Sequence, residues 1–200
     1  MKYIYLSRHG ESLYNKEDRI GGNSNLSPDG YTYGKVLSED VNKIDIEMVM
    51  TSELTRTIDT AQSINHRKIS MSCLNEIHSG ICENLTYEEV MIKYPEIYVA
   101  RNKDKYNFRY PQGESYNDLF IRLKPVFDII DIINGPILII AHQAVLRVIY
   151  GVLMDMDHNS FPHISIPLHT LMRLNISTLH KSCTIQSYVV SHPLILRNIL

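Results

Sequence analysis

The sequence contains no tryptophan, only three cysteines and no long hydrophobic run among its 200 residues. The longest uninterrupted apolar stretch, Ile137 to Ala141, is far shorter than the roughly 18 residues of a membrane-spanning helix. The first residues become charged too early for a signal peptide. Widely spaced cysteines without a CxxC pair are typical of reduced thiols in the cytosol rather than of a disulfide framework. We therefore expect a cytoplasmic protein that does not enter a membrane.

The sequence also lacks an excess of charge of either sign. Lys and Arg number 20, Asp and Glu number 22, and the net charge is −2. Such a balance does not favour nucleic acid as a partner, so any anion site requires a local cluster of cations. The hydrophobic content of 44% predicts one folded domain over residues 1–190. The sequence indicates neither a role for the apolar tail at residues 191–200 nor an oligomeric state.

Hydrophobic runs alternate with helix caps along the chain. Strands are predicted over residues 2–7, 48–50, 137–140, 170–176 and 184–190. Helices are predicted over residues 28–41, 54–64, 86–94, 115–133 and 143–154. This order predicts an α/β fold, a three-layer sandwich with a mainly parallel central sheet flanked by helices.

Residues that could take part in catalysis follow directly after three predicted strands. Arg8 and His9 follow the first strand, residues 52–56 follow the second, and His142 follows the run at 137–140. Ligands of α/β sheets bind beyond the carboxyl ends of the strands, so these side chains are expected at one edge of the sheet. Six other histidines are expected to be structural or exposed: His66, His78, His158, His163, His180 and His192.

Two other kinds of site fit these residues less well. Glu11 is close enough in sequence to His9 for a metal site, but the guanidinium of Arg8 repels a divalent cation and matches a phosphate instead. The glycine-containing segment at residues 30–35 is too short for the phosphate loop of a nucleotide enzyme. The remaining interpretation is an anion site of arginines and two histidines, in which a neutral imidazole attacks phosphorus.

These residues also resemble a known family. The segment LSRHGES at residues 6–12 is similar to the signature of the histidine phosphatase superfamily, also called phosphoglycerate-mutase-like. TSELTRT at 51–57, NEI at 75–77 and His142 follow in the order of that family. Within it, the resemblance is greatest to the fructose-2,6-bisphosphatase domain of the 6-phosphofructo-2-kinase/fructose-2,6-bisphosphatases. It extends over residues 3–190 and is most specific in RNKDKYNFRYPQGESYNDL at 101–119.

The resemblance implies phosphoryl transfer in two steps, without a metal ion or other cofactor. His9 would be the nucleophile that forms a phosphohistidine, and Glu76 would protonate the leaving sugar oxygen and then activate water. The transferring phosphoryl group would be held by Arg8, Asn15, Arg56 and His142. The sugar and its second phosphate would be bound by Gly21, Tyr87, Arg101, Lys105, Tyr116, Gln143 and Arg147.

The implied reaction is hydrolysis of the 2-phosphate of fructose 2,6-bisphosphate to fructose 6-phosphate and phosphate. The alternatives are a phosphatase for other sugar phosphates or phosphoglycerates, a mutase, and a non-catalytic regulator that binds a phosphorylated ligand. Two departures from the relatives matter. No segment of the chain matches their kinase domain, and His78 occupies a position where they carry an acid. The sequence leaves open how His78 affects the protonation of nearby Glu76 or the pH optimum.

Overall fold

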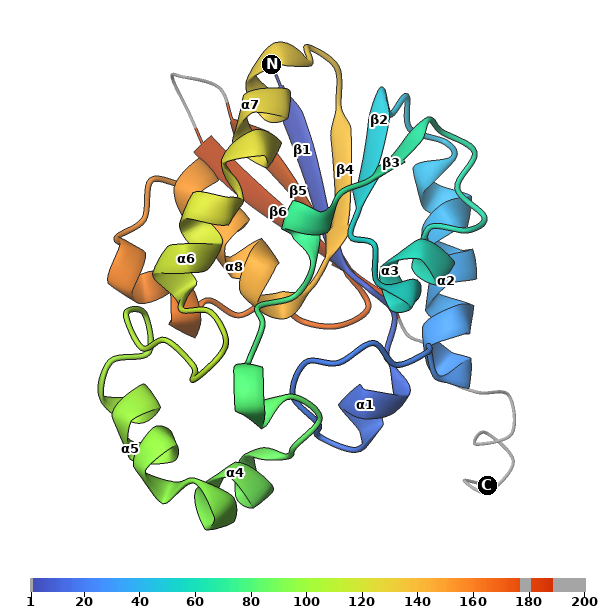
Figure 1. Ribbon diagram of the computed structural model, residues 1–200. Coiled ribbons are helices and arrows are strands. Elements are labelled where there is room, and N and C mark those ends of the chain that lie inside the picture. The colour runs from blue at the N-terminus through green and yellow to red at the C-terminus, as the bar shows by residue number, and fades with distance from the viewer. Residues whose placement is uncertain (1, 177–180, 189–200) are drawn as a thin grey trace, which may run out of the picture.

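The central sheet follows the predicted class. The structure is a computed structural model that describes residues 2–176 and 181–188. Within them the strand order is β3-β2-β4-β1-β5-β6 (Figure 1). The strands are β1 Tyr3–Arg8, β2 Met48–Thr51, β3 Lys68–Ser70, β4 Ile137–Ala141, β5 Thr170–Ile176 and β6 Lys181–Ser187. Strands β1 to β4 pair in parallel, whereas β5 pairs antiparallel with both β1 and β6.

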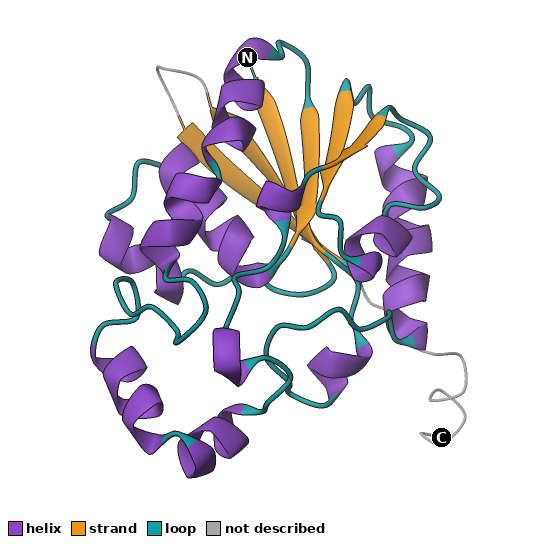
Figure 2. Cartoon of the chain, viewed as in Figure 1, coloured by secondary structure: helices purple, strands orange, loops and turns teal. Residues whose placement is uncertain are grey.

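Helices cover both faces of this sheet, as Figure 2 shows. The α-helices are α1 Leu13–Lys16, α2 Pro28–Val41, α3 Thr55–Thr60, α4 Tyr87–Lys93, α5 Pro95–Lys103, α6 Tyr116–Arg122, α7 Lys124–Ile132 and α8 Gln143–Leu153. Short 3-10 helices are η1 Ser72–Leu74, η2 Gly80–Cys82 and η3 His158–His163. None of the helices in the described residues is long and apolar enough to cross a membrane.

Side chains along each strand point alternately to the two faces of the sheet, and they form a core layer on each face. Ile4 and Leu6 of β1 lie in one cluster with Leu119 of α6 and other residues of α7 and α8. Tyr5, between them, lies in the opposite cluster with Leu37 of α2. Successive residues of a strand face opposite sides of a sheet, so one strand contributes to both cores. All five residues of β4 are buried, and the predicted three-layer sandwich is confirmed.

A small lobe lies beyond the carboxyl ends of the parallel strands. This lobe, residues 77–113, contains η2, α4 and α5 and occupies the lower part of the molecule in Figure 1. It has a core of its own, formed by Cys82, Val90, Ile97 and Tyr110. The lobe therefore lies next to the strand ends where the sequence places its candidate site residues.

The prediction of a single helix over residues 115–133 is wrong, because this segment forms two helices. α6 ends at Arg122 and α7 starts at Lys124. Pro125 lies in the first turn of α7, where it has no N–H to donate to the carbonyl four residues earlier. The apolar stripe continues across the break, since Leu119, Leu123 and Ile130 are all buried.

Other boundaries also differ from the prediction. α3 ends at Thr60 rather than near residue 64, and the hydroxyls of Thr57 and Thr60 donate to carbonyls of the preceding turn, which competes with regular helix. Strand β3 has only three residues and was not predicted. The last strand starts at Lys181 instead of residue 184. Residues 189–190 and the tail at 191–200 lie outside the described residues.

Candidate active site

The carboxyl ends of β1 and β4 bring His9 and His142 together. The two strands are parallel neighbours, with Arg8 opposite Ala141. The backbone N–H of His9 donates to the carbonyl of Ala141 at 3.0 Å. The ring centroids of the two histidines lie 5.1 Å apart, and His9 and His142 are only 3% and 0% exposed. The strand-end histidines therefore form one buried cluster, as the sequence predicts.

Hydrogen bonding determines which nitrogen of His9 is free to react. Nδ1 lies 2.6 Å from the carbonyl oxygen of Gly10. Because a carbonyl only accepts, Nδ1 carries the proton and the lone pair of the neutral ring lies on Nε2. Burial, followed by the positive charges of Arg56 and Arg8, lowers the pKa of His9 well below its usual value. The ring is therefore neutral at neutral pH and can act as a nucleophile through Nε2.

His142 is oriented by the end of strand β2. Its Nε2 lies 2.8 Å from the hydroxyl of Ser52, which in turn lies 2.7 Å from the hydroxyl of Thr57. Burial, followed by the charge of Arg56, lowers the pKa of His142 well below its usual value. Nδ1 is buried and has no partner among the described residues. When Ser52 donates to Nε2, the proton on Nδ1 is available to an anionic ligand.

Two buried arginines flank the histidines. Arg8 Nη1 donates to the carbonyl of Ile166 at 3.1 Å, while its buried Nε has no partner among the described residues. Arg56 Nη1 donates to the carbonyl of Gly22 at 2.7 Å. Burial lowers the pKa of Arg8 to about 10 and also lowers that of Arg56, so both remain charged at neutral pH. Carbonyl partners hold these guanidiniums in place without neutralising their charge.

Asn15 and Gly21 lie on the segment after β1, at the side of the same site. Asn15 forms a capping box with Ser12: its Oδ1 accepts from the Ser12 N–H at 3.0 Å, and its own N–H donates to the Ser12 hydroxyl at 3.1 Å. This arrangement leaves the amide Nδ2 of Asn15 to donate to a ligand. Gly21 has φ of 65°, and a Cβ there would meet the carboxylate of Glu83 at 2.3 Å. The positive φ favours glycine here, and a larger residue would also displace the Glu83 carboxylate.

Glu76 provides a carboxyl group close to both arginines. It follows η1, and its Oε1 accepts from the N–H of Ile77 at 2.9 Å. Burial raises the pKa of Glu76, against the opposing influence of the Ile77 hydrogen bond and of Arg56 and Arg8. The carboxyl thus keeps its proton to a higher pH than a free glutamic acid. It can donate that proton to a leaving group and later accept one from water.

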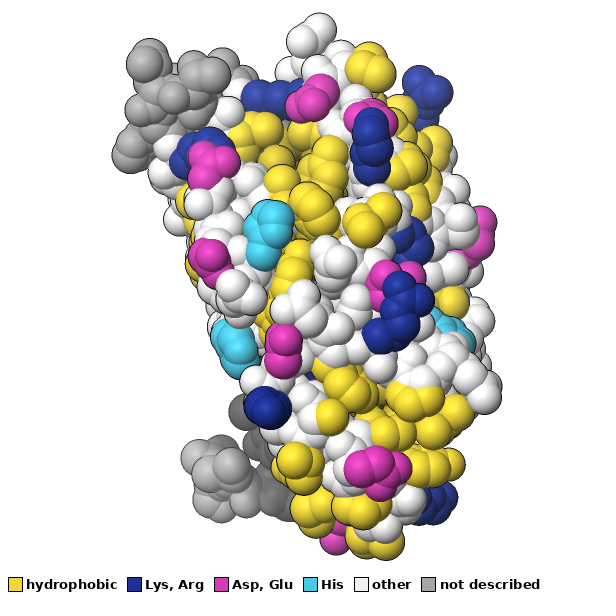
Figure 3. Space-filling view, turned by 60° about the vertical axis from the view of Figure 1, so that its left-hand side comes forward, with side chains coloured by type: hydrophobic (Ala, Val, Ile, Leu, Met, Phe, Trp, Pro, Cys, Tyr) yellow, Lys and Arg dark blue, Asp and Glu magenta, His cyan; other side chains and the backbone are white. Residues whose placement is uncertain are grey.

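A cavity of about 250 Å³ joins these groups. The predicted site residues that line it are Arg8, His9, Asn15, Gly21, Arg56, Glu76, Tyr87, Arg101, Tyr116, Gln143 and Arg147. Five arginines and two carboxyl groups line the cavity, although the whole chain has a net charge of −2. By contrast, cationic side chains are scattered among acidic and apolar ones on the face that Figure 3 draws. The local cluster of cations that an anion site requires is therefore present in this cavity.

The outer part of the cavity has its own cationic group. The Arg101 guanidinium carbon lies 4.9 Å from the ring centre of Tyr87 and 5.9 Å from that of Tyr110. Arg101 also donates to the Tyr87 hydroxyl at 3.0 Å. Arg147 donates to the Tyr116 hydroxyl at 3.1 Å and is electrostatically coupled to Arg8 at the inner end. Two tyrosines of the lobe thus hold Arg101 at the cavity, and Arg147 lies between the two cationic groups.

Two predicted site residues do not line the cavity. His142 lies behind the lining, where it is completely buried against His9. Lys105 donates through Nζ to the carbonyl of Pro162 at 3.0 Å. Burial, followed by the charges of Arg101 and Arg147, lowers the pKa of Lys105 to about 8. This electrostatic coupling places Lys105 next to the outer cationic group rather than at the cavity wall.

The sequence of the chain matches a family whose signature contains residues of this site. Residues 4–198 match the histidine phosphatase superfamily, branch 1. The chain belongs to this superfamily. Its family signature, residues 6–12, contains both Arg8 and His9 of the buried cluster.

Within the superfamily, the chain is similar in sequence to fructose-2,6-bisphosphatases. The chain is 47% identical over 176 residues to the fructose-2,6-bisphosphatase of Saccharomyces cerevisiae, covering 86% of this chain and 39% of that protein. It is 43% identical over 173 residues to the 6-phosphofructo-2-kinase/fructose-2,6-bisphosphatase of Gallus gallus, covering 86% of this chain and 37% of that protein. The chain therefore spans about two fifths of the length of these relatives.

Solved structures agree on the fold of this histidine phosphatase. The α-ribazole phosphatase of Shigella flexneri matches with a TM-score of 0.82 at 22% identity, covering 93% of this chain and 96% of that one. Bacillus stearothermophilus YhfR matches with a TM-score of 0.81 at 23% identity, covering 94% and 98%. At these identities the likeness concerns the phosphoglycerate-mutase-like fold.

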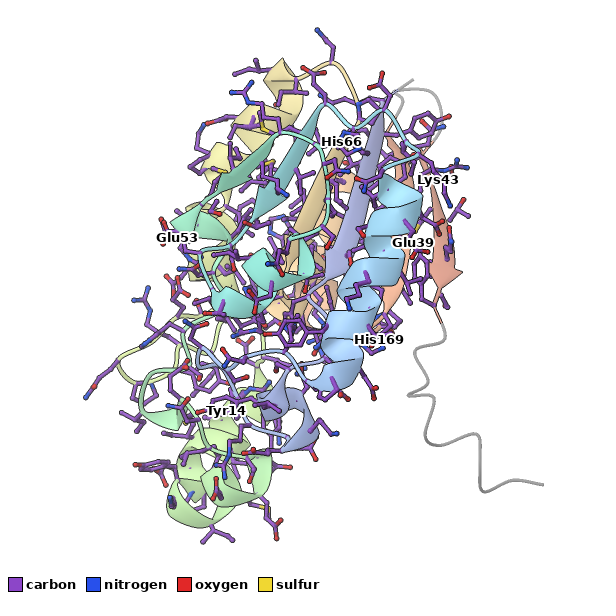
Figure 4. All side chains as sticks on the ribbon, turned by 90° about the vertical axis from the view of Figure 1, so that its right-hand side faces the viewer. Tyr14, Glu39, Lys43, Glu53, His66 and His169 are labelled. Carbon is purple, nitrogen blue, oxygen red and sulfur yellow. The ribbon has the colours of Figure 1, made fainter. Side chains whose placement is uncertain are left out.

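Sequence reasoning missed several residues that shape the site. Tyr110 lies in the segment 101–119 that carries the family resemblance, but its contact with Arg101 depends on the fold of the lobe. Ser52 follows a predicted strand, which places it at the correct edge without indicating its bond to His142. Tyr14 lines the cavity from α1, and Figure 4 shows it at the lower end of the sheet layers, near the lobe.

The remaining histidines differ in their positions. His66 lies at the upper end of the sheet in Figure 4, opposite Tyr14, and its Nε2 lies 3.1 Å from the carbonyl of Val41. His169 lies nearer the site, where its Nε2 accepts from the N–H of Glu11 at 3.2 Å. No group of three or more His, Cys, Asp or Glu side chains within residues 2–176 and 181–188 could hold a metal ion. His169 instead supports the loop that follows β1.

Proposed function

We propose that the chain hydrolyses the 2-phosphate of fructose 2,6-bisphosphate to give fructose 6-phosphate and phosphate. The observation that carries this proposal is the presence of two cationic groups in one cavity, one around His9 and one around Arg101. A substrate with two phosphates requires two such groups, whereas a simple monoester requires one. The relatives with 47% and 43% identity, both named for this bisphosphatase, support the same substrate.

The proposed reaction has two steps. In the first, Nε2 of His9 attacks phosphorus, the bond from phosphorus to the sugar oxygen breaks, and Glu76 gives its proton to that oxygen. In the second, water attacks the phosphohistidine and gives a proton to Glu76, so that His9 and phosphate are released. Arg8, Arg56 and His142 stabilise the transferring oxygens, and their donors need little reorganisation because hydrogen bonds or burial already fix them. Asn15 adds a further donor.

The outer group accounts for recognition of the rest of the substrate. We propose that Arg101, Arg147 and Lys105 attract the 6-phosphate. The Tyr87 and Tyr116 hydroxyls, the Gln143 amide and the backbone at Gly21 contact the sugar.

The domain responsible comprises residues 1–190. A cytoplasmic location is also proposed, because the three free thiols, Cys73, Cys82 and Cys183, suit a reducing compartment.

A panel of phosphate esters tests this function. In the presence of a chelator, we expect the protein to release phosphate from fructose 2,6-bisphosphate. Release from fructose 1,6-bisphosphate, fructose 6-phosphate and p-nitrophenyl phosphate should be far slower. Arg101→Ala should raise KM for the bisphosphate roughly 10- to 100-fold, since a charged hydrogen bond contributes about 1.5–3 kcal/mol. The same variant should leave kcat/KM for p-nitrophenyl phosphate nearly unchanged. Equal turnover of all esters would instead indicate a phosphatase of wider range, and tight binding without turnover would indicate a regulator.

The pKa of Lys105 gives this recognition a pH dependence. Burial and two nearby arginines lower that pKa to about 8, so the amine loses its charge as pH rises through 8. We expect KM for fructose 2,6-bisphosphate to rise by about tenfold between pH 7 and 9, in inverse proportion to the protonated fraction of Lys105. Lys105→Arg should remove this rise in KM, because a guanidinium remains charged over the range. A rise in KM of the same size in Lys105→Arg would show that another group controls it.

A further inference from the structure

The loop that carries Glu76 is held by Arg122, at the end of α6. The guanidinium of Arg122 donates to the carbonyl of Cys73 at 2.7 Å, to that of Asn75 at 3.1 and 3.0 Å, and to that of Glu76 itself at 3.4 Å. A further contact to the carbonyl of Ser72 measures 3.3 Å. One side chain therefore binds most of the carbonyls of residues 72–76. The planar fork of an arginine suits this task because it directs several N–H donors at once.

Glu114 fixes Arg122 and also holds the loop on the other side of Glu76. Arg122 Nε and Nη2 donate to the two carboxylate oxygens of Glu114 at 2.7 and 2.9 Å. The same carboxylate accepts from the N–H of His78 at 2.9 Å, and the Glu114 N–H donates to the His78 carbonyl at 2.8 Å. The side chains of Arg122 and Glu114 are 23% and 22% exposed. The pair thus restrains the backbone both before and after Glu76.

The position of the Glu76 carboxyl depends on its own backbone and on α8. The carboxyl accepts from the N–H of the adjacent Ile77 at 2.9 Å, a contact that moves with the loop, and from the backbone N–H of Ala144, which is met only when the loop is correctly placed. The loop lies at the surface, because Ser72, Asn75, Glu76 and His78 line a second, open groove together with Glu114 and Arg122. Leu74 anchors the start of the loop in the core and the Asn75 side chain accepts from the N–H of Glu53 at 3.0 Å, while the Arg122 and Glu114 contacts hold its backbone carbonyls.

We propose that Arg122, paired with Glu114, is a positioning residue for proton transfer by Glu76. It touches neither the cavity nor the reacting atoms, and it acts by holding the loop carbonyls so that the carboxyl of Glu76 meets the leaving oxygen. A displacement of about 1 Å in a reacting group can cost on the order of 100-fold in rate. The inference rests on the proposed function in one respect, namely that Glu76 is the group that transfers the proton.

The test compares two leaving groups in the first chemical step. A sugar oxygen needs a proton in order to leave, whereas p-nitrophenolate leaves without one because it is a much weaker base. Rapid-quench measurements give the rate of phosphoenzyme formation from fructose 2,6-bisphosphate and from p-nitrophenyl phosphate. Arg122→Lys, which keeps the charge but loses the fork, should lower the first rate about 10- to 100-fold and the second less than about threefold.

Two further variants complete the design. Glu114→Gln keeps an oxygen for the His78 N–H but loses the charge that orients Arg122, so it should show the same selectivity with a smaller loss. It also keeps the inference testable if Arg122→Lys does not fold, which thermal unfolding will show. Arg109→Lys is the matched control, because Arg109 also pairs with a carboxylate of α6, that of Asp118, and makes no contact with the Glu76 loop. It should leave both rates unchanged.

Each outcome has a definite meaning. Equal losses with both esters in folded variants would make Arg122 a purely structural residue, and no loss with either would also overturn the inference. If wild-type protein reacts with p-nitrophenyl phosphate but not with fructose 2,6-bisphosphate, the proposed substrate is wrong. The leaving-group comparison then uses whichever alkyl phosphate of the ester panel the protein hydrolyses, so the two failures remain distinguishable.

Discussion

His9→Ala is expected to lower hydrolysis of fructose 2,6-bisphosphate by at least about a thousandfold and to abolish the phosphoenzyme. The part of the chain that the structure describes offers no equivalent nucleophile in its place. His142 is the nearest candidate, but its Nε2 lone pair is engaged with Ser52 and its Nδ1 then carries a proton, so the ring can donate to an oxygen but has no free lone pair for attack. Removal of the His9 ring therefore leaves the cationic groups able to bind the substrate without a group that can attack it.

Two measurements check this expectation. Phosphate release gives the loss of turnover, and quenching in alkali, in which phosphohistidine is stable, followed by phosphoamino-acid analysis detects phosphohistidine in the wild type and its absence in the variant. His163→Ala is a suitable control, since His163 is exposed at the end of η3 and does not line the cavity. Full activity in His9→Ala, or a phosphohistidine that persists in it, would move the nucleophile to another residue.

The direction of the His9 pKa suits the proposed chemistry at neutral pH. Burial and two guanidiniums lower the pKa of His9, so the neutral, nucleophilic ring predominates above that lowered value. Burial shifts Glu76 the other way and raises its pKa, so its protonated form persists to a higher pH. The same cationic, largely buried surroundings thus shift the two pKa values in the opposite directions that a nucleophile and a general acid require.

Much of the site could be predicted from the sequence because its residues follow strands. A buried run ending in Arg8 and His9, and another ending before His142, are local patterns. Parallel pairing of β1 with β4 then places both histidines at one edge without further information. The roles of Glu76, Tyr87 and Arg101 had no such basis, because they lie on loops and in the lobe. Their prediction came from the family resemblance alone.

The features that escaped prediction depend on contacts between distant segments. Tyr110 flanks Arg101 only once the lobe has folded, and Arg122 reaches carbonyls about 46 to 50 positions away in the sequence. Periodicity identifies which face of α6 is apolar but not what a polar residue at its end will bind. Pro125, by contrast, was visible in the sequence, and the break between α6 and α7 follows from its missing N–H.

Glu76→Gln is expected to lower kcat for fructose 2,6-bisphosphate about 10²- to 10⁴-fold, the usual contribution of general acid–base catalysis. The amide has nearly the shape of the carboxyl and can still accept from the Ile77 N–H through its oxygen. It cannot transfer a proton, so both the departure of the sugar oxygen and the activation of water are lost. Glu96→Gln is the matched control, because Glu96 is exposed on α5 and does not line the cavity.

The two steps respond differently to p-nitrophenyl phosphate, and this difference identifies the role of Glu76. In Glu76→Gln the good leaving group should still depart and give a burst of one equivalent of p-nitrophenolate. Phosphohistidine should then accumulate because water is not activated.

The sugar bisphosphate tests the same role through pH. Burial raises the pKa of Glu76, and the wild-type rate of phosphoenzyme formation should fall as pH rises through this pKa, since the protonated acid is then lost. The variant should lack this fall. A normal steady-state rate without a burst would show that another group supplies and accepts the proton.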